Sequence, residues 1–187
     1  MADARAAIDE HLELAGRIEE LLPLVDRVVR ALIECYEREG RVYSFGNGGS
    51  AADSLHLAEE LVARFQRERR PLAAQSFAAD PTVLTCIGND FDFADVFARQ
   101  VRAFVRRGDV VACFSTSGRS ANVVAGLEAA RSVGAVTVLF GGGDGGPAAE
   151  HADVALVVPS SSTARVQELH VLLLHLVLDA VDEWAAS

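Results

Sequence analysis

Cysteine is scarce in this chain of 187 residues, and the scarcity excludes two kinds of architecture. Its three cysteines, Cys35, Cys86 and Cys113, are too few and too scattered for a disulfide framework. No CxxC pair is present, which disfavours a thiolate zinc site. Each cysteine lies in an apolar run, so we expect all three to be small buried hydrophobic residues.

Long hydrophobic runs are also missing. Charged residues interrupt the alanines and leucines of the first sixteen positions, which is unlike a signal peptide. The apolar run from Val171 to Val181 is short and contains His175 and Asp179, so it cannot span a bilayer. We therefore expect a reduced, cytoplasmic protein that does not enter membranes.

Basic residues are outnumbered, with 17 Lys and Arg against 27 Asp and Glu, a net charge of −10 and a pI of about 4.9. This balance argues against general binding to nucleic acid or to anionic membranes, both of which need basic patches. It does not exclude an anionic small molecule held by a few local groups. Half of the residues are hydrophobic, and a chain of this length should bury about 70% of its unfolded surface. No linker or shift in composition appears, so we expect one domain over residues 1–187.

The hydrophobic pattern changes period along the chain. Helical spacing covers the first forty residues as two helices, with a break at Pro23 and a stop at Gly40. Strand-like runs and helical runs then alternate. The strands are expected at 41–45, 72–77 (the weakest), 109–114, 136–140 and 154–158, and the helices at 51–69, 94–106, 121–133 and from 163 to about 184. This alternation predicts an α/β fold: a doubly wound parallel sheet with helices on both faces and an N-terminal helical extension.

Two strand-to-helix loops have an unusual composition. The first runs from Gly46 to Ser50 and combines glycines with a hydroxyl just before a helix. The second places several hydroxyls around Gly118, again where a helix opens; they belong to Ser115, Thr116, Ser117 and Ser120. Such loops share one end of a parallel sheet, where backbone N–H groups and helix dipoles favour an anion. We predict a monophosphate site there, although Ser50 and Ser120 could simply be helix N-caps.

Two other phosphate-binding motifs do not fit the first loop. A P-loop needs Gly-Lys-Ser/Thr, and no lysine is present. A dinucleotide-binding fold needs an acidic residue about twenty positions later, and segment 72–77 supplies none. Nucleoside triphosphate hydrolysis and dinucleotide binding are therefore disfavoured.

Histidines and polar residues on two helices could support proton transfer. His56 and Glu60 are four residues apart on one helical face, and the last helix carries Gln167, Glu168, His170 and His175. Glu60 could abstract a proton while His175 donates one, and His56, Glu60, Gln167 and His175 are acceptable ligands for a borderline divalent ion. Gln167 and His175 are eight residues apart, about 12 Å along a helix. A shared ion would need extended side chains, an irregular first turn or ligands from a neighbouring subunit.

These segments together resemble one family. The segments are Phe45–Ser50, His56–Leu61, Gly88–Phe91, Ser115–Asn122 and Arg165–His170 with His175. In this order they resemble the sugar isomerase (SIS) domain, and more narrowly the sedoheptulose 7-phosphate isomerases, or phosphoheptose isomerases. The likeness extends over almost the whole chain. It implies a flavodoxin-like three-layer sandwich, with helices 1–40 used for packing and oligomerisation.

The resemblance also implies a function. Sedoheptulose 7-phosphate would become D-glycero-D-manno-heptose 7-phosphate through an enediol, with Glu60 as base and His175 as acid, in nucleotide-activated heptose biosynthesis. Family members are homotetramers with active sites at subunit interfaces and one Zn²⁺ per subunit, here held by His56, Glu60, Gln167 and His175. Substrate and phosphate would contact Asn47, Gly48, Gly49, Ser50, Arg64, Asn89, Asp90, Ser115, Thr116, Ser117, Ser120 and Gln167.

Three positions depart from the family pattern. Arg119 stands where asparagine is common and could contact phosphate or face solvent, the run Gly141–Gly143 replaces a Thr-Gly, and Ala164 replaces an aspartate. Three other functions therefore stay open: a non-catalytic SIS protein that associates with a DNA-replication initiator, a sugar-phosphate sensor without turnover, and an isomerase of another ketose phosphate. The presence of both Glu60 and His175 favours an enzyme.

Overall fold

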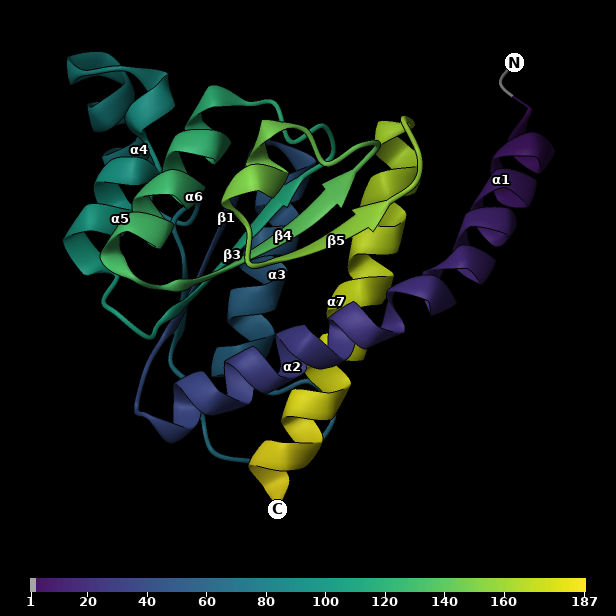
Figure 1. Cartoon of the computed structure of the whole chain (residues 1–187), viewed down its shortest axis with the longest axis horizontal. Coiled ribbons are helices and arrows are strands. Elements are labelled where there is room, and N and C mark those ends of the chain that lie inside the picture. The colour runs from purple at the N-terminus through teal and green to yellow at the C-terminus, as the bar shows by residue number, and fades with distance from the viewer. Residues whose placement is uncertain (1–2) are drawn as a thin grey trace.

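Five parallel strands form one sheet in the order β2-β1-β3-β4-β5, as the computed structural model of residues 3–187 shows (Figure 1). The first two residues of the predicted N-terminal extension lie outside the described part. This strand order is that of flavodoxin-like sheets and reverses between β1 and β3. The doubly wound parallel sheet is thereby confirmed. The strands are β1 (Val42–Gly46), β2 (Ala74–Ser76), β3 (Val110–Ser115), β4 (Val136–Gly142) and β5 (Val154–Val158).

Helices cover both faces of this sheet, which explains why its central strands are continuous apolar runs. Along β3, Val110, Ala112 and Phe114 pack in one layer, whereas Val111 and Cys113 pack in the other. The first layer holds α2 (Leu22–Glu37), α3 (Gly49–Val62) and α7 (Thr163–Ala186), and the second holds α4 (Pro81–Asp90), α5 (Ala98–Phe104) and α6 (Ala121–Val133).

The N-terminal extension consists of α1 (Ala4–Arg17), a 3₁₀ turn (Ile18–Leu21) and α2. Pro23 lies in the first turn of α2, where its missing N–H costs nothing, so the predicted break is present. α1 projects beyond the sheet and leaves Ile8 and Leu12 exposed (Figure 1). Among the described residues, none of the helices combines the length and the apolarity needed to cross a membrane.

Two predicted helices are shorter than expected. The helix predicted over 51–69 is α3, which ends at Val62 because the following segment leaves the helix to make tertiary contacts, with Phe65 against the core and Arg69 on the last carbonyls of α3. The helix predicted over 94–106 becomes a 3₁₀ turn (Phe93–Asp95) and α5, and the weak strand at 72–77 shortens to β2.

One helix was not predicted. α4 begins at Pro81 after Asp80, whose carboxylate accepts hydrogen bonds from the N–H groups of Thr82 and Val83. An N-cap Asp followed by Pro is a helix-start signal that the sequence does contain. Cys86 lies on the outer face of this helix and is exposed, so the expectation that it is buried was wrong, while Cys35 and Cys113 are buried as expected.

Glycines allow the loops after β3 and β4 to pack directly on each other. Gly118 has a φ of +61°, and a Cβ there would overlap the carbonyl oxygen of Gly145. A Cβ at Gly142 would lie 2.5 Å from the carbonyl oxygen of Thr116. The glycine run Gly141–Gly143, which replaces Thr-Gly, therefore lets the loop after β4 pack against the hydroxyl-rich loop after β3. Arg119, one of the departures noted above, pairs with Asp144 at 2.7 Å and both side chains are largely exposed.

We expect Gly118→Ala to destabilise the protein much more than Gly143→Ala. Both glycines have positive φ, which costs about 1 kcal/mol for alanine, but a Cβ at Gly143 meets nothing closer than 4.0 Å. Gly118→Ala adds a backbone clash and should lower the free energy of unfolding by more than about 2 kcal/mol. Urea denaturation of both variants measures the difference. Equal losses of unfolding free energy in the two variants would show that the loops after β3 and β4 do not depend on the close approach of Gly118 to Gly145.

Candidate active site

The two hydroxyl-rich loops lie side by side because β1 and β3 are neighbours in the sheet. Together they enclose a small polar cavity of about 60 Å³, which we call the cradle. This volume exceeds the space that one water needs. The cradle is lined by Asn47, Ser50, Phe114, Ser115, Thr116, Ser117 and Ser120. The structure therefore brings together most of the predicted phosphate-binding side chains.

The cradle lies at the start of two helices, α3 and α6. Gly48, with a φ of +57°, is the N-cap of α3, and Ser120 is the N-cap of α6. Neither helix start has a side-chain capping hydrogen bond, so the hydroxyls of Ser50 and Ser120 are not used as caps. Helix N-termini carry unpaired N–H groups and partial positive charge. These groups can hold an anion although no cationic side chain is among the residues that line the cradle.

Two asparagines fix the relative position of the loops. Asn47 and Asn122 exchange side-chain amide hydrogen bonds, each 2.9 Å long. Asn47 follows β1 and Asn122 lies in the first turn of α6. The pair links the two halves of the cradle across the point where the strand order reverses.

A second cluster lies further along α3. His56 and Glu60 face each other, with His56 Nε2 3.4 Å from Glu60 Oε1. The ring of His175, from α7, lies 5.2 Å from the ring of His56 and 5.2 Å from that of Phe65. We call His56, Glu60 and His175 the acid–base cluster. Glu59 also brings an oxygen within 4.8 Å of His56 and Glu60 donor atoms, which the sequence patterns did not indicate.

The surroundings of His175 favour its neutral form. Burial lowers the pKa of His175 below its ordinary value, and the charge of His56 lowers it further, while Glu60 opposes the shift. A neutral imidazole can donate one N–H and offer one lone pair. Such a ring can polarise a carbonyl oxygen or bind a metal ion.

Gln167 does not join the acid–base cluster. Its side-chain amide lies against Gly49, where a Cβ would displace it. Gln167 is thus at the cradle end of α7, and His175 is two turns further on. Of the four predicted zinc ligands, His56 and Glu60 have donor atoms within 4.8 Å of each other, and the ring of His175 lies 5.2 Å from that of His56. Gln167 lies at the other end of the site.

Three further predicted contact residues are neither among the residues that line the cradle nor part of the acid–base cluster. Arg64 follows the end of α3, and Asn89 and Asp90 end α4. All three are exposed, and the side chain of Asn89 donates to that of its neighbour Asp90 over 2.7 Å.

A buried pair of polar groups lies between the cradle and the acid–base cluster. His170 is fully buried, and its Nε2 lies 3.0 Å from the carbonyl oxygen of Gly141. Because a carbonyl only accepts, Nε2 carries the hydrogen and Nδ1 is left as an acceptor. Asp53 Oδ2 lies 3.9 Å from that Nδ1, and neither atom has a hydrogen-bond partner among the described residues. Asp53 was missed from the sequence, although its position three residues before His56 was a signal.

Burial shifts both pKa values toward the uncharged forms. It raises the pKa of Asp53 to about 6, with a small opposing effect of His56, and it lowers the pKa of His170 to about 4. A protonated Asp53 could donate to His170, whereas an ionised Asp53 places two acceptors face to face. Unsatisfied buried groups of this kind cost about 1–3 kcal/mol.

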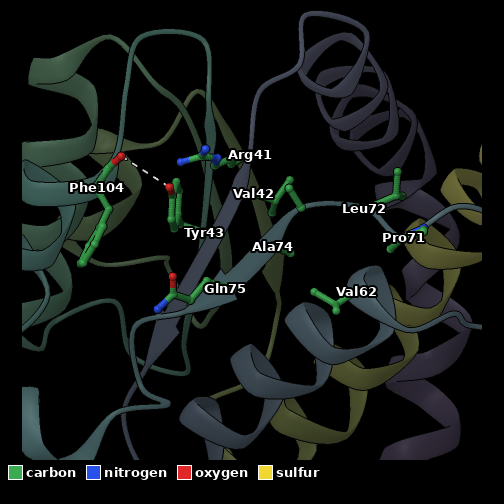
Figure 2. Close-up of a pocket in the computed structure, with 10 residues that line it drawn as sticks. Arg41, Val42, Tyr43, Val62, Pro71, Leu72, Ala74, Gln75 and Phe104 are labelled. Atoms are coloured by element: carbon green, nitrogen blue, oxygen red, sulfur yellow. Dashed lines mark hydrogen bonds between the residues drawn. The ribbon is translucent and has the colours of Figure 1, made fainter.

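A larger cavity, of about 570 Å³, lies at the other end of the sheet (Figure 2). Figure 2 shows Val42, Ala74, Val62 and Phe104 around it, with the Tyr43 hydroxyl donating to the carbonyl oxygen of Phe104 over 3.4 Å. It is lined mainly by apolar side chains and contains no carboxylate or histidine. None of the three side chains of the acid–base cluster lines this cavity.

We expect Asp53→Asn to stabilise the protein at pH 8. The carboxyl titrates near 3.8 when unfolded and near 6 when folded, so the folded state binds more protons between these values and loses stability as the pH rises through them. An asparagine carries no charge and can donate to His170. The free energy of unfolding should rise by about 1–3 kcal/mol at pH 8. The increase should be smaller at pH 4, where Asp53 is protonated.

Thermal melting at both pH values measures this effect. Asp26→Asn, at an exposed position on α2, is the control and should change stability by less than about 0.5 kcal/mol at either pH. A lower melting temperature for Asp53→Asn at pH 8 would contradict the assignment of an unsatisfied pair.

Comparison with known proteins agrees with this geometry. The sequence pattern described as "SIS domain" matches residues 8–142. The phosphoheptose isomerase of Roseiflexus sp. (strain RS-1) is 46% identical over 165 residues, covering 88% of this chain and 84% of that protein. The phosphoheptose isomerase of Citrifermentans bemidjiense is 40% identical over 183 residues, covering 97% and 95% of the two chains.

A solved structure gives the same result. The phosphoheptose isomerase of Neisseria gonorrhoeae superposes with a TM-score of 0.90 at 38% identity, covering 96% of each chain. The last two similarities cover nearly the whole chain. The chain therefore belongs to the SIS domain family and, within it, to the phosphoheptose isomerases.

Proposed function

We propose that this protein is an aldose–ketose isomerase that converts sedoheptulose 7-phosphate to D-glycero-D-manno-heptose 7-phosphate, in nucleotide-activated heptose biosynthesis. The observation that carries the proposal is the arrangement along α3. An anion-binding N-terminus lies at one end of this helix, and Glu60, beside His56 and His175, lies near the other. A sugar phosphate with its phosphate in the cradle would extend its other end toward the acid–base cluster.

In this proposal the cradle holds the phosphate. The hydroxyls of Ser50, Ser115, Thr116, Ser117 and Ser120 donate to phosphate oxygens, and the N–H groups around Gly48 and Gly49 add to them. Asn47 keeps the two loops together, and Gln167 lies where it can contact the sugar chain near Gly49. This end of the site binds and orients the substrate.

Proton transfer takes place at the acid–base cluster. Glu60 takes a proton from the carbon beside the ketose carbonyl, and the electron pair of that C–H bond forms the C=C bond of the enediol. His175, as a neutral imidazole, donates its N–H hydrogen to the carbonyl oxygen. Return of a proton to the former carbonyl carbon, with loss of the proton from the neighbouring hydroxyl, then gives the aldose. A binding protein without turnover would not need Glu60 and His175 to meet in this way.

The donor set also fits a zinc ion. Imidazole nitrogens of His56 and His175 and a carboxylate oxygen of Glu60 are typical zinc ligands. We propose that they hold one Zn²⁺ and that Gln167 completes the set after a local rearrangement or from a neighbouring subunit. Bound there, zinc would polarise the sugar carbonyl as a Lewis acid.

We further propose that the chain is a single SIS unit that assembles as a homotetramer. The exposed Ile8 and Leu12 on α1 line a largely apolar cavity of about 340 Å³ against α7, a surface suited to another copy. Asn89 and Asp90 precede Phe91 and Phe93, whose large exposed side chains also suit an interface. Contacts of Asn89, Asp90 and Arg64 with substrate would then be made in a neighbouring subunit's site. Three unpaired cysteines fit the reducing cytoplasm.

Incubation with sedoheptulose 7-phosphate in deuterated water, followed by NMR, tests the reaction. We expect an aldose 7-phosphate product and incorporation of deuterium at the former carbonyl carbon. The assay is run with and without added zinc. Absence of both product and exchange under both conditions would rule out isomerisation of this substrate, and turnover of another ketose phosphate alone would reassign it.

Glu60→Gln should lower the rate of deuterium exchange by about 10²–10⁴-fold, because the amide cannot accept the proton. Glutamine has the same shape, so folding and phosphate binding should be kept, as measured by circular dichroism and by binding of inorganic phosphate. Glu128→Gln, at an exposed position on α6, is the matched control. Full activity of Glu60→Gln would remove Glu60 from the role of base.

A further inference from the structure

Arg69, a buried arginine outside the site, holds the end of the helix that carries Glu60. The side chain of Arg69 is 1% exposed. Its guanidinium donates to the carbonyl oxygens of Glu60 (2.7 Å), Leu61 (2.9 Å) and Arg70 (2.9 Å). Its Nε donates to a carboxylate oxygen of Asp182 over 2.7 Å. All of its donor nitrogens are therefore engaged with protein groups.

The two α3 carbonyls that Arg69 binds have no partner within the helix. α3 ends at Val62, so the carbonyl groups of its last turn lack the N–H of a following turn. Ala63 N–H still bonds the carbonyl of Glu59, but the carbonyls of Glu60 and Leu61 come after that last helical bond. Arg69 thus fixes the backbone of Glu60 from outside the helix.

Asp182 is the residue that holds Arg69 in this position. It lies on α7, seven residues after His175, and its side chain is 1% exposed. One of its oxygens accepts from Arg69, and the other accepts from the N–H groups of Gln66 (3.0 Å) and Arg67 (2.6 Å). Burial alone would raise the pKa of Asp182, but these hydrogen bonds outweigh it and hold the pKa below its ordinary value. Asp182 is therefore a carboxylate that links α7 to the segment after α3.

The segment 63–70 also contacts His175 directly. Phe65 places its ring 5.2 Å from the ring of His175. Arg67 donates to Asp179 over 2.7 Å, and Asp179 is one turn beyond His175 on α7. The segment therefore connects the end of α3 that carries Glu60 with the part of α7 that carries His175.

We propose that Arg69 and Asp182 are positioning residues that set the distance between Glu60 and His175, an inference that rests on the proposed isomerisation. Neither residue lines the cradle, and Arg69 binds the backbone of Glu60 and not its carboxylate. The apolar core keeps α3 and α7 packed without them, but the last turn of α3 would lose its two hydrogen bonds from Arg69 and, with them, the bridge through Arg69 to Asp182 on α7. Misplacement of a reacting group by about 1 Å can cost about 10²-fold in rate.

The proposal predicts an effect on kcat with little effect on KM. Ser50, in the cradle, is ten residues before Glu60 on the same helix, so movement of the last turn leaves the phosphate site intact. Arg69→Lys and Asp182→Asn should lower kcat by about 10–100-fold and change KM by less than about threefold. Lysine keeps the charge, but its single ammonium group cannot bind acceptors on both α3 and α7, as the planar guanidinium of arginine does. The double variant should lose no more than the worse single variant, because the two residues act as one unit.

A matched control separates positioning from general destabilisation. Val101→Ala removes fully buried volume from α5 in the other layer and should lower the melting temperature without changing kcat at a temperature where it is folded. All variants are assayed where circular dichroism shows native helix content. Unchanged kcat in Arg69→Lys and Asp182→Asn, or additive losses in the double variant, would overturn the proposal.

A second measurement keeps the proposal testable if the proposed reaction fails. Zinc affinity, measured by competition with a chromophoric chelator, depends on the spacing of His56, Glu60 and His175 without any turnover. We expect it to fall about tenfold in both variants and to stay unchanged in Val101→Ala. A wild type that binds zinc but does not isomerise sedoheptulose 7-phosphate would refute the proposed function. The zinc affinities of the variants would then decide whether Arg69 and Asp182 are positioning residues. A wild type that neither isomerises the substrate nor binds zinc would overturn both the proposed function and the positioning proposal.

Discussion

The packing of one helix, α3, against the sheet and α7 is the constraint on which the rest of the site depends. α3 starts at the point where the strand order reverses, so its N-terminus must face the loops after β1 and β3. A helix advances 1.5 Å per residue, which places Glu60 about 15 Å along the axis from Ser50. The length of the substrate that fits between the anion site and the base is therefore set by helix geometry. α7 runs beside α3 and supplies Gln167 at one end and His175 at the other.

Several polar groups are buried in the layer that contains α3 and α7. The hydroxyl of Ser44 on β1 donates to the backbone carbonyl of Ser54 on α3, and the hydroxyls of Ser54 and Ser76 are 2.8 Å apart. Asp53 and His170 lie in the same layer without hydrogen-bond partners among the described residues. A protein selected for stability alone would fill such positions with apolar side chains. Destabilising groups of this kind concentrate at functional sites, where the rest of the fold compensates for them.

Sequence patterns predicted the sheet and most of the site because these depend on local signals. β5 and α6 have the predicted bounds, and the hydroxyls around Gly118 are where a strand-to-helix loop in a parallel sheet must place them. The end of α3 was predicted too late because it is fixed by Arg69 and Asp182, which are 113 residues apart in sequence. The exposure of Cys86 and the separation of Gln167 from His175 also depend on tertiary packing, which periodicity does not report.

The cradle has one consequence for how an anion reaches it. It is built from dipoles and hydroxyls, in a chain whose net charge is −10. A doubly charged sugar phosphate therefore approaches against the long-range field of the protein and is attracted only at contact. Added salt screens that repulsion over about a Debye length while leaving the short-range dipoles in place. Association should thus become faster as ionic strength rises, which is the reverse of the behaviour of enzymes that steer anions with clusters of lysine and arginine.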